Sequence, residues 1–282
     1  MRFAFILSIV LLSSSVHAQN KYGSLFWNRT SLYNPASSGV NQRIYSAVTG
    51  QQQWLGTTDA PIKGTVLFDM KLSALNSGTG INFSFGKNGS IKRFDINLNY
   101  NYQFNLQNNR LLCVGLSGGI VRNKIDLSEV YIDPLEESGN KLTLFDFKLG
   151  VIYHSNHLDL GLSSIHYKPS GNSGNYTGTL NHYLLFGSYR FDLSEAIELQ
   201  PNLLIELDNL NNINPGLRSG LLLIVKERLW TGITYALKNN IGATVGYDFK
   251  GKIRAGYAFE YIISSNNHAQ QGNHEIMLAL ML

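Results

Sequence analysis

The sequence contains very little cysteine and few charged residues. Cys113 is the single cysteine among 282 residues, so no intramolecular disulfide and no cysteine-based metal cluster can form. Charged residues make up 15% of the chain, whereas soluble domains average about 25%. The net charge of +4 comes from scattered basic residues that alternate with acids, which does not indicate a nucleic-acid partner.

Long apolar runs are also missing, except at the N-terminus. Arg2 precedes the apolar stretch Phe3–Leu12, and Val16-His17-Ala18 forms a plausible cleavage site before Gln19. We therefore predict that residues 1–18 are a signal peptide. Because no cysteine lies near the cut, a lipoprotein signal is excluded. No later run reaches the roughly 18 apolar residues of a spanning helix, so we expect an exported chain without an inner-membrane helix.

The clearest pattern in the chain is the alternation in Phe94–Leu106. Apolar and aromatic residues occupy every even position from Phe94 to Leu106, and polar residues, mostly Asn, occupy the odd positions between them. Alternation of period two places these sets on opposite faces of a β-strand. The run exceeds the usual five or six residues of a soluble strand and matches the about 9–11 residues of a strand that crosses a bilayer. A strand of a soluble sandwich is the alternative, but such strands seldom alternate for so long.

Similar runs fill the rest of the chain from residue 43, and we count about fourteen. They suggest an all-β fold, a transmembrane antiparallel up-and-down β-barrel over residues 43–282 of the bacterial outer membrane. The runs are 43–54, 64–74, 79–87, 91–106, 110–122, 142–154, 157–167, 180–192, 197–208, 216–226, 228–238, 240–250, 252–264 and 273–282.

The connections between these runs support the same interpretation. Every even-numbered connection is short, and several odd-numbered ones are long, among them 123–141 and 168–179. Bacterial barrels have short periplasmic turns and longer outer loops at alternating ends. An even number of strands would also return both ends of the barrel to the periplasm.

Residues 19–42 have no strand pattern, and Asn34-Pro35 and Gly39 are turn signals within them. A barrel of about fourteen strands lies between the filled eight-stranded type and the aqueous channels of 16–18 strands, so its lumen needs filling or it would leak. We therefore expect this N-terminal segment on the periplasmic side or as a plug in the lumen.

The predicted inward-facing charges are of mixed sign, and we expect a cross-strand lattice rather than a selectivity ring or a catalytic dyad. They are Asp69, Lys71, Arg93, Asp95, Asp146, Lys148, Arg190, Asp192, Glu198, Glu206, Arg218, Arg254 and Glu260.

No motif in the chain predicts catalysis, a cofactor or a metal site. His154 and His157 flank a short turn without a third ligand at suitable spacing. Ser163, Ser164 and His166 are adjacent in sequence, but no G-x-S-x-G elbow accompanies them. Cys113 is expected on the inner face as a small packing residue. We therefore expect a protein that is not an enzyme and has no cofactor and no metal.

Two short motifs are not required by barrel physics. One is Tyr33-Asn34-Pro35-Ala36, and the other is Gln53-Trp54-Leu55-Gly56 with Ala60-Pro61. A tight turn and an interfacial aromatic followed by an outer loop explain them structurally. A functional role explains them equally well, since special turns often carry function.

At these residues the chain resembles the PorP/SprF family of type IX secretion membrane proteins. The resemblance is carried by short landmarks in order along the mature chain: L-Y-N-P-A at Leu32–Ala36 with Gly39, Q-W-L-G at Gln53–Gly56 with Ala60-Pro61, Y-R-F-D-L-S at Tyr189–Ser194, R-A-G-Y-A-F-E-Y at Arg254–Tyr261 and H-E-I-M-L at His274–Leu278. These landmarks supply the candidates for a partner-binding or structural role: Tyr33, Asn34, Pro35, Gln53, Trp54, Gly56, Pro61, His274 and Glu275.

The resemblance implies an outer-membrane component of type IX secretion in a Bacteroidota-type bacterium. It implies as partners the periplasmic ring of the secretion machine and a large secreted surface protein, such as an adhesin used in gliding, besides outer-membrane lipid. The family offers no catalytic residues. A general or selective diffusion porin is the alternative function, and an outer-membrane hydrolase ranks last.

Overall fold

The computed structural model describes residues 22–56, 59–125, 141–169, 180–207, 216–237, 240–263 and 272–282. The predicted signal peptide and most of the long connections 123–141 and 168–179 lie outside these residues. Within the described ranges, no helix is long and apolar enough to span a membrane.

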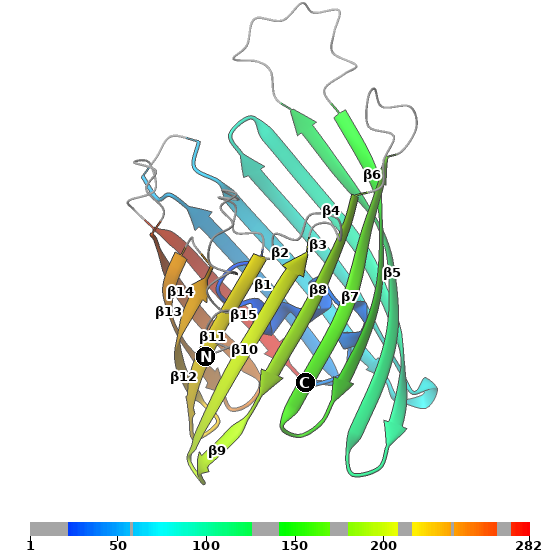
Figure 1. Ribbon diagram of the computed structural model, residues 1–282, viewed down its shortest axis with the longest axis vertical. Coiled ribbons are helices and arrows are strands. Elements are labelled where there is room, and N and C mark those ends of the chain that lie inside the picture. The colour runs from blue at the N-terminus through cyan, green and yellow to red at the C-terminus, as the bar shows by residue number, and fades with distance from the viewer. Residues whose placement is uncertain are drawn as a thin grey trace, which may run out of the picture.

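The described residues form one closed antiparallel barrel (Figure 1). Each strand pairs with the next along the chain, except that β8 and β9 both pair with β10. The pairing of β15 with β1 from Tyr45↔Met281 to Gln53↔Asn273 closes the cylinder. The strands are β1 Ile44–Gln53, β2 Ile62–Leu72, β3 Ser77–Asn88, β4 Ile91–Leu106, β5 Arg110–Ile125, β6 Lys141–His154, β7 Leu158–Pro169, β8 Leu180–Tyr189, β9 Phe191–Ser194, β10 Ile197–Leu207, β11 Gly216–Val225, β12 Leu229–Ala236, β13 Asn240–Phe249, β14 Ile253–Ile262 and β15 Asn273–Met281.

One predicted strand differs from the structure. The run 180–192 is divided at Arg190 into β8 and β9, which both pair with β10. The fifteen strands therefore occupy fourteen strand positions around the barrel. The amide of Arg190 donates to the carbonyl of His157 at 2.8 Å. On the facing strand, pairing is interrupted at Gln200 and Pro201, and proline has no amide hydrogen for a ladder. The remaining strand bounds differ from the prediction by a few residues.

The alternation along β4 is confirmed by burial. Leu98 is 62% exposed and Asn101 is fully buried, so the apolar set faces outward and the polar set faces the lumen. From Phe94 to Leu106 the strand rises about 40 Å, which at a tilt of about 40° covers a band about 30 Å tall. This height matches the hydrocarbon core of a bilayer, about 30 Å thick.

The two ends of the barrel carry different connections (Figure 1). Turns such as 107–109 and 155–157 join strands at the lower end, where β1 begins and β15 ends. Since short turns and both barrel termini are periplasmic in bacterial barrels, the lower end is the periplasmic one and the upper end faces outward.

Candidate functional site in the barrel lumen

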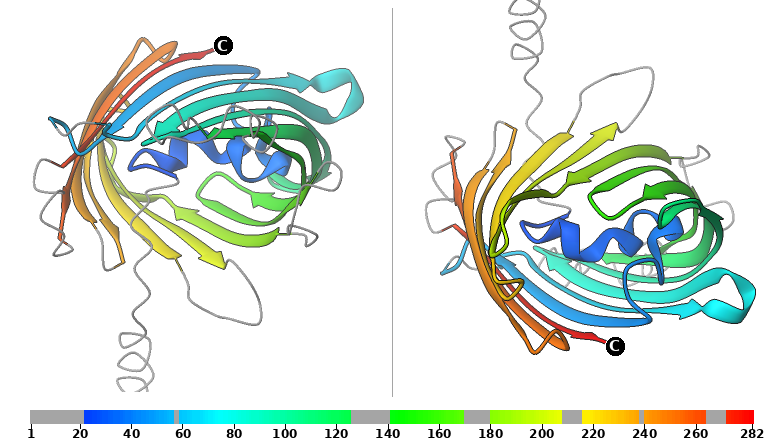
Figure 2. Two further views of the ribbon diagram at one scale, coloured as in Figure 1. Left: turned by 90° about the horizontal axis from the view of Figure 1, so that it is seen from above. Right: turned by 90° about the horizontal axis from the view of Figure 1, so that it is seen from below.

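The N-terminal segment runs through the interior of the barrel (Figure 2). It contains three-residue-per-turn helices η1, Phe26–Leu32, and η2, Pro35–Ser37. Most of its side chains are buried, and Phe26 and Tyr33 pack in a cluster with inward residues of β5 to β10. Burial raises the pKa of the Tyr33 hydroxyl, which therefore stays protonated and donates to the carbonyl of Phe26 at 3.3 Å. We call residues 22–42 the lumen segment.

Asn34 and Pro35 start helix η2 and fasten it to the wall. The Oδ1 atom of Asn34 accepts from the amide of Ala36 at 3.0 Å, so Asn34 caps the helix, and Pro35 occupies its first position. The Nδ2 atom of Asn34 donates to the carbonyls of Val151 at 3.1 Å and Leu162 at 3.3 Å. One side chain thus joins the cap of η2 to two neighbouring barrel strands.

Inward glycines make room for this helix. A Cβ atom at Gly115 would lie 2.5 Å from the amide nitrogen of Ala36, and one at Gly150 would lie 2.0 Å from Oδ1 of Asn34. Distances below 3.0 Å are not tolerated by real side chains. The close approach of η2 to β5 and β6 therefore depends on the missing side chains at these positions.

The polar face of β4 provides the largest set of hydrogen bonds to the segment. Asn99 Nδ2 donates to Ser31 O at 2.9 Å, Asn101 Nδ2 to Ser38 O at 2.6 Å, and Gln103 Nε2 to Gly39 O at 3.3 Å. On β3, Asn82 Nδ2 also donates to Ser31 O, at 2.9 Å. The side-chain amides thus satisfy backbone carbonyls of a non-strand segment that is buried away from bulk water.

Glu275 anchors the other end of the segment. Its Oε2 accepts from the amides of Ser24 at 2.7 Å and Leu25 at 3.2 Å, and its Oε1 lies 2.6 Å from Nη2 of Arg29. Both side chains of this ion pair are almost fully buried. Arg29 also donates to Oγ1 of Thr49 at 3.1 Å. A second carboxylate, Glu260 on β14, accepts from Oγ of Ser24 and pairs with Arg218 at 2.5 Å.

The other candidate residues lie at different places. Gln53 ends β1, and its backbone N–H donates to the carbonyl of Pro61 at 2.9 Å across the outer hairpin. Trp54 and Gly56 follow it with φ of 51° and 87°, so both occupy the left-handed region that favours glycine. His274 faces outward and contacts the Tyr257 hydroxyl at 2.7 Å. Because β1 pairs with β15, Gln53 and His274 lie on adjacent strands near this hairpin. Tyr33, Asn34 and Pro35 lie apart from them, in the lumen.

The expected lattice of inward charges is present among the described residues. Ion pairs join Arg93–Asp95, Lys148–Asp146, Arg190–Glu198, Arg218–Glu260 and Arg254–Asp248. Lys148 also donates to the carbonyl of Leu32 at 3.0 Å, and Arg254 donates to Oδ1 of Asn28 at 2.7 Å. The lattice therefore serves the lumen segment as well as the wall.

The histidines and the cysteine have structural environments. His154 and His157 contact Asp159 at 2.5 Å and Asp192 at 3.1 Å in separate pairs, and in the described ranges no three His, Cys, Asp or Glu residues gather into a possible metal site. Cys113 is buried against Ala36 and Val40 of the lumen segment, which confirms the expected inner-face packing role.

Ser164 and His166 are brought together on the outer wall. His166 contacts Ser164 Oγ at 3.1 Å through Nε2 and Asn181 Oδ1 at 2.7 Å through Nδ1. Ser163 lies on the opposite, inward face of β7 and is buried. Hydrolysis also needs donors aimed at a developing oxyanion, whereas the backbone of β7 is engaged in ladders with β6 and β8.

The sequence did not reveal what the polar face of β4 binds. The pattern of four Asn and one Gln predicts only a polar inward face, whereas backbone carbonyls of residues 31–39 accept from three of these side chains. The signal available in the sequence was the excess of amides over charges, because an amide donates to a carbonyl without burying a net charge.

A closed, lipid-facing barrel whose lumen holds its own N-terminal segment defines this protein as an outer-membrane β-barrel. Residues 15–280 match the family model described as type IX secretion system membrane protein PorP/SprF, and the chain belongs to this family. No curated protein matches the sequence.

Solved structures are similar to the fold. The outer membrane protein Omp33 of Acinetobacter baumannii aligns with a TM-score of 0.54 at 7% identity, covering 86% of this chain and 100% of Omp33. A TodX deltaS2S3 mutant, a monoaromatic hydrocarbon channel, aligns with a TM-score of 0.52 at 10% identity, covering 89% of this chain and 93% of TodX. At these identities the likeness concerns the fold alone.

Proposed function

We propose that this type IX secretion barrel is a non-enzymatic anchor, which holds or assists the export of a large secreted surface protein such as a gliding-type adhesin. The observation that carries the proposal is the attachment of the lumen segment. Carboxylates and amides of β3, β4 and β15, together with backbone carbonyls of β6 and β7, hold it by buried contacts. An interior occupied in this way supports a role in protein binding more than passive diffusion.

The two ends of the barrel offer different partners. The long connections 123–141 and 168–179 leave the outer end, where a secreted protein emerges, and we assign them to the secreted partner. The short turns face the periplasm, where ring components of the secretion machine are the expected partners. The lumen segment starts beside Glu275 and Glu260 and leads into β1 at the periplasmic end of the barrel.

Surface display tests the anchor. The gene is deleted and replaced by the wild type or by a variant in which 126–140 is exchanged for a short Gly/Ser linker. We expect the deletion strain to lose the adhesin-like protein from its surface, and the loop variant to release it into the medium while retaining a folded barrel. A matched control exchanges the periplasmic turn 107–109 for Asn-Gly-Asn. Unchanged display in the deletion strain would refute the proposal.

Conductance separates the anchor from the alternative of a diffusion porin, which the polar inner wall of the barrel favours. We expect purified wild-type protein to be closed in a planar bilayer, and a variant lacking residues 22–40 to conduct. A steady open pore in the wild type would support the porin instead. A closed deletion variant would show that other parts of the chain block the lumen.

A further inference from the structure

Four lysines form a line across the outer end of four adjacent strands. Lys87 of β3 pairs with Lys92 of β4, Lys92 pairs with Lys124 of β5, and Lys124 pairs with Lys141 of β6. Directly paired residues share one face of a sheet, with Cβ atoms about 5 Å apart. We call these residues the lysine row.

The lysine row faces away from the lumen. Phe85 and Phe94 lie two residues below Lys87 and Lys92 on the same face, and they are 52% and 39% exposed. Lys92, Lys124 and Lys141 are themselves exposed. Arg122 adds a further exposed cation two residues below Lys124 on that face.

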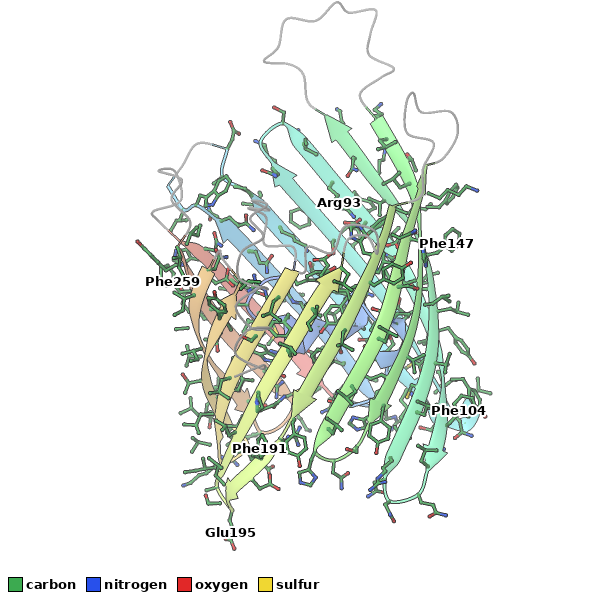
Figure 3. All side chains as sticks on the ribbon, viewed as in Figure 1. Arg93, Phe104, Phe147, Phe191, Glu195 and Phe259 are labelled. Carbon is green, nitrogen blue, oxygen red and sulfur yellow. The ribbon has the colours of Figure 1, made fainter. Side chains whose placement is uncertain are left out.

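The row also marks the upper boundary of the apolar band. On β3 and β4, each lysine is the next outward-facing residue above an exposed phenylalanine. On β5 and β6, one further outward-facing residue lies between the lysine and the exposed apolar residue, which is Ile120 or Phe145. Figure 3 shows the outward side chains of these strands, with Phe147 labelled on β6 below the rim. The ammonium groups therefore sit where the hydrocarbon core gives way to headgroups.

The charge pattern of the row is opposite to that of the lumen. Inside the barrel, cations pair with acids, as Lys148 does with Asp146 at 3.3 Å. In the row, the strand register places lysine opposite lysine, and like charges directly opposite each other destabilise a sheet. Lys87 also contacts Asp59 at 2.8 Å with both groups well exposed, which is a weak kind of pair. Anions of an outside molecule that lie between the ammonium groups reduce this repulsion.

We propose that the lysine row binds the phosphate groups of anionic glycolipid headgroups in the outer leaflet. Lysine carries a flexible point charge that suits phosphate oxygens. An anionic membrane surface attracts the cationic side chains that lie close to it. The lipid fits because its phosphates and its acyl chains lie at the same two levels as the row and the phenylalanines below it. An acidic protein would have no use for the apolar side chains beneath the row.

Lipid binding in detergent tests this site. The mature wild-type chain is compared with K87Q/K92Q/K124Q/K141Q, using bis-phosphorylated lipid A and the same lipid without phosphates as probes, with the bound lipid counted by native mass spectrometry. We expect the wild type to prefer the phosphorylated probe, and the variant to bind it at least about tenfold more weakly. The probe without phosphates should bind both proteins alike.

Matched variants keep the result interpretable. K226Q/R228Q/K250Q/K252Q removes four exposed cations from the periplasmic turns and should leave the affinity unchanged. The four-fold Lys→Arg variant should retain binding. If the four-fold Gln variant does not fold, K92Q/K124Q tests the two central lysines, with a loss of severalfold expected.

Three outcomes would overturn the proposal. The Gln variant could bind phosphorylated lipid A as well as the wild type does, as it would if acids of the connection 126–140 neutralised the row. Both probes could bind the wild type equally, which would mean that only the acyl chains are recognised. The Gln variant could lose surface display of the secreted protein while its lipid affinity is unchanged, which would assign the row to an acidic protein partner.

Discussion

Replacing Gly115 by valine should push η2 off the wall of the barrel. The Cβ atom would meet the nitrogen and Cα of Ala36 at 2.5 and 2.7 Å and the carbonyl carbon of Pro35 at 2.7 Å. All three are backbone atoms, which cannot rotate away as a side chain can. Overpacking of this kind costs about 1–3 kcal/mol, which corresponds to a roughly five- to 150-fold rise in the population with η2 displaced.

The native cysteine reports this displacement. Cys113 is fully buried beneath Ala36 and Val40, and no other cysteine competes for the reagent. The rate of maleimide labelling of the folded protein should therefore rise by about the same factor as the displaced population. G118V is the matched control, because Gly118 lies on the same strand with nothing within 4 Å of its added Cβ, and its rate should equal that of the wild type.

The reasoning about the lumen segment fails if G115V is labelled as slowly as G118V while the barrel remains folded. That result would mean that η2 does not cover Cys113. A folded barrel is recognised by its heat-dependent mobility on a detergent gel, which both variants should retain because the strand ladders are unchanged.

Three further substitutions test other parts of the structure. Glu275→Ala removes the acceptor of two backbone amides and the partner of buried Arg29, so the lumen segment should be destabilised by about 3–5 kcal/mol. Protease should then cut the chain near residues 24–29. Substitution of the exposed residue in Glu195→Ala is the control, and equal protease resistance of the two variants would contradict the anchoring role of Glu275. Asn101→Ala removes the side-chain amide that donates to Pro35 O and Ser38 O. Each buried carbonyl left without this donor costs about 1–3 kcal/mol, so labelling of Cys113 should accelerate. An unchanged labelling rate would show that the amides of the barrel wall are dispensable. Leu98→Lys puts a charge on the lipid face near the middle of β4 and should cost about 2–4 kcal/mol of folding free energy in lipid vesicles, whereas Leu106→Lys at the periplasmic edge should cost about 0–1 kcal/mol; equal costs would argue against the assigned position of the membrane.

Local pattern predicted the wall of the barrel well. In Phe94–Leu106 the side-chain period of two decides which residues face lipid and which face inward, and that assignment depends on no distant contact. The inward placement of Cys113 followed from the same rule. The prediction of one continuous strand over residues 180–192 was wrong. The strand breaks at Arg190, opposite Gln200 and Pro201 on the neighbouring strand, where pairing is interrupted.

The lumen segment was much less predictable. Asn34-Pro35 indicates a turn, but no local pattern specifies that Asn34 donates to Val151 and Leu162, which lie more than a hundred residues away along the chain. Likewise, Glu275 was noticed within a short motif, while its pairing with Arg29 depends on the closure of β15 onto β1. Of the residues singled out, Tyr33, Asn34, Pro35 and Glu275 belong to the lumen contacts, and Gln53, Trp54, Gly56, Pro61 and His274 do not.

The sequence by itself determined that this chain forms a lipid-facing β-barrel, because alternation, strand length and loop parity are all local and repeat along the chain. Only the tertiary structure decided what occupies the lumen and which side chains hold it, since closing the barrel brings Asn101, Glu275 and Gly115 to face a segment that is distant from them in sequence. The lysine row likewise exists only through strand register, which aligns four separate positions into one charged line.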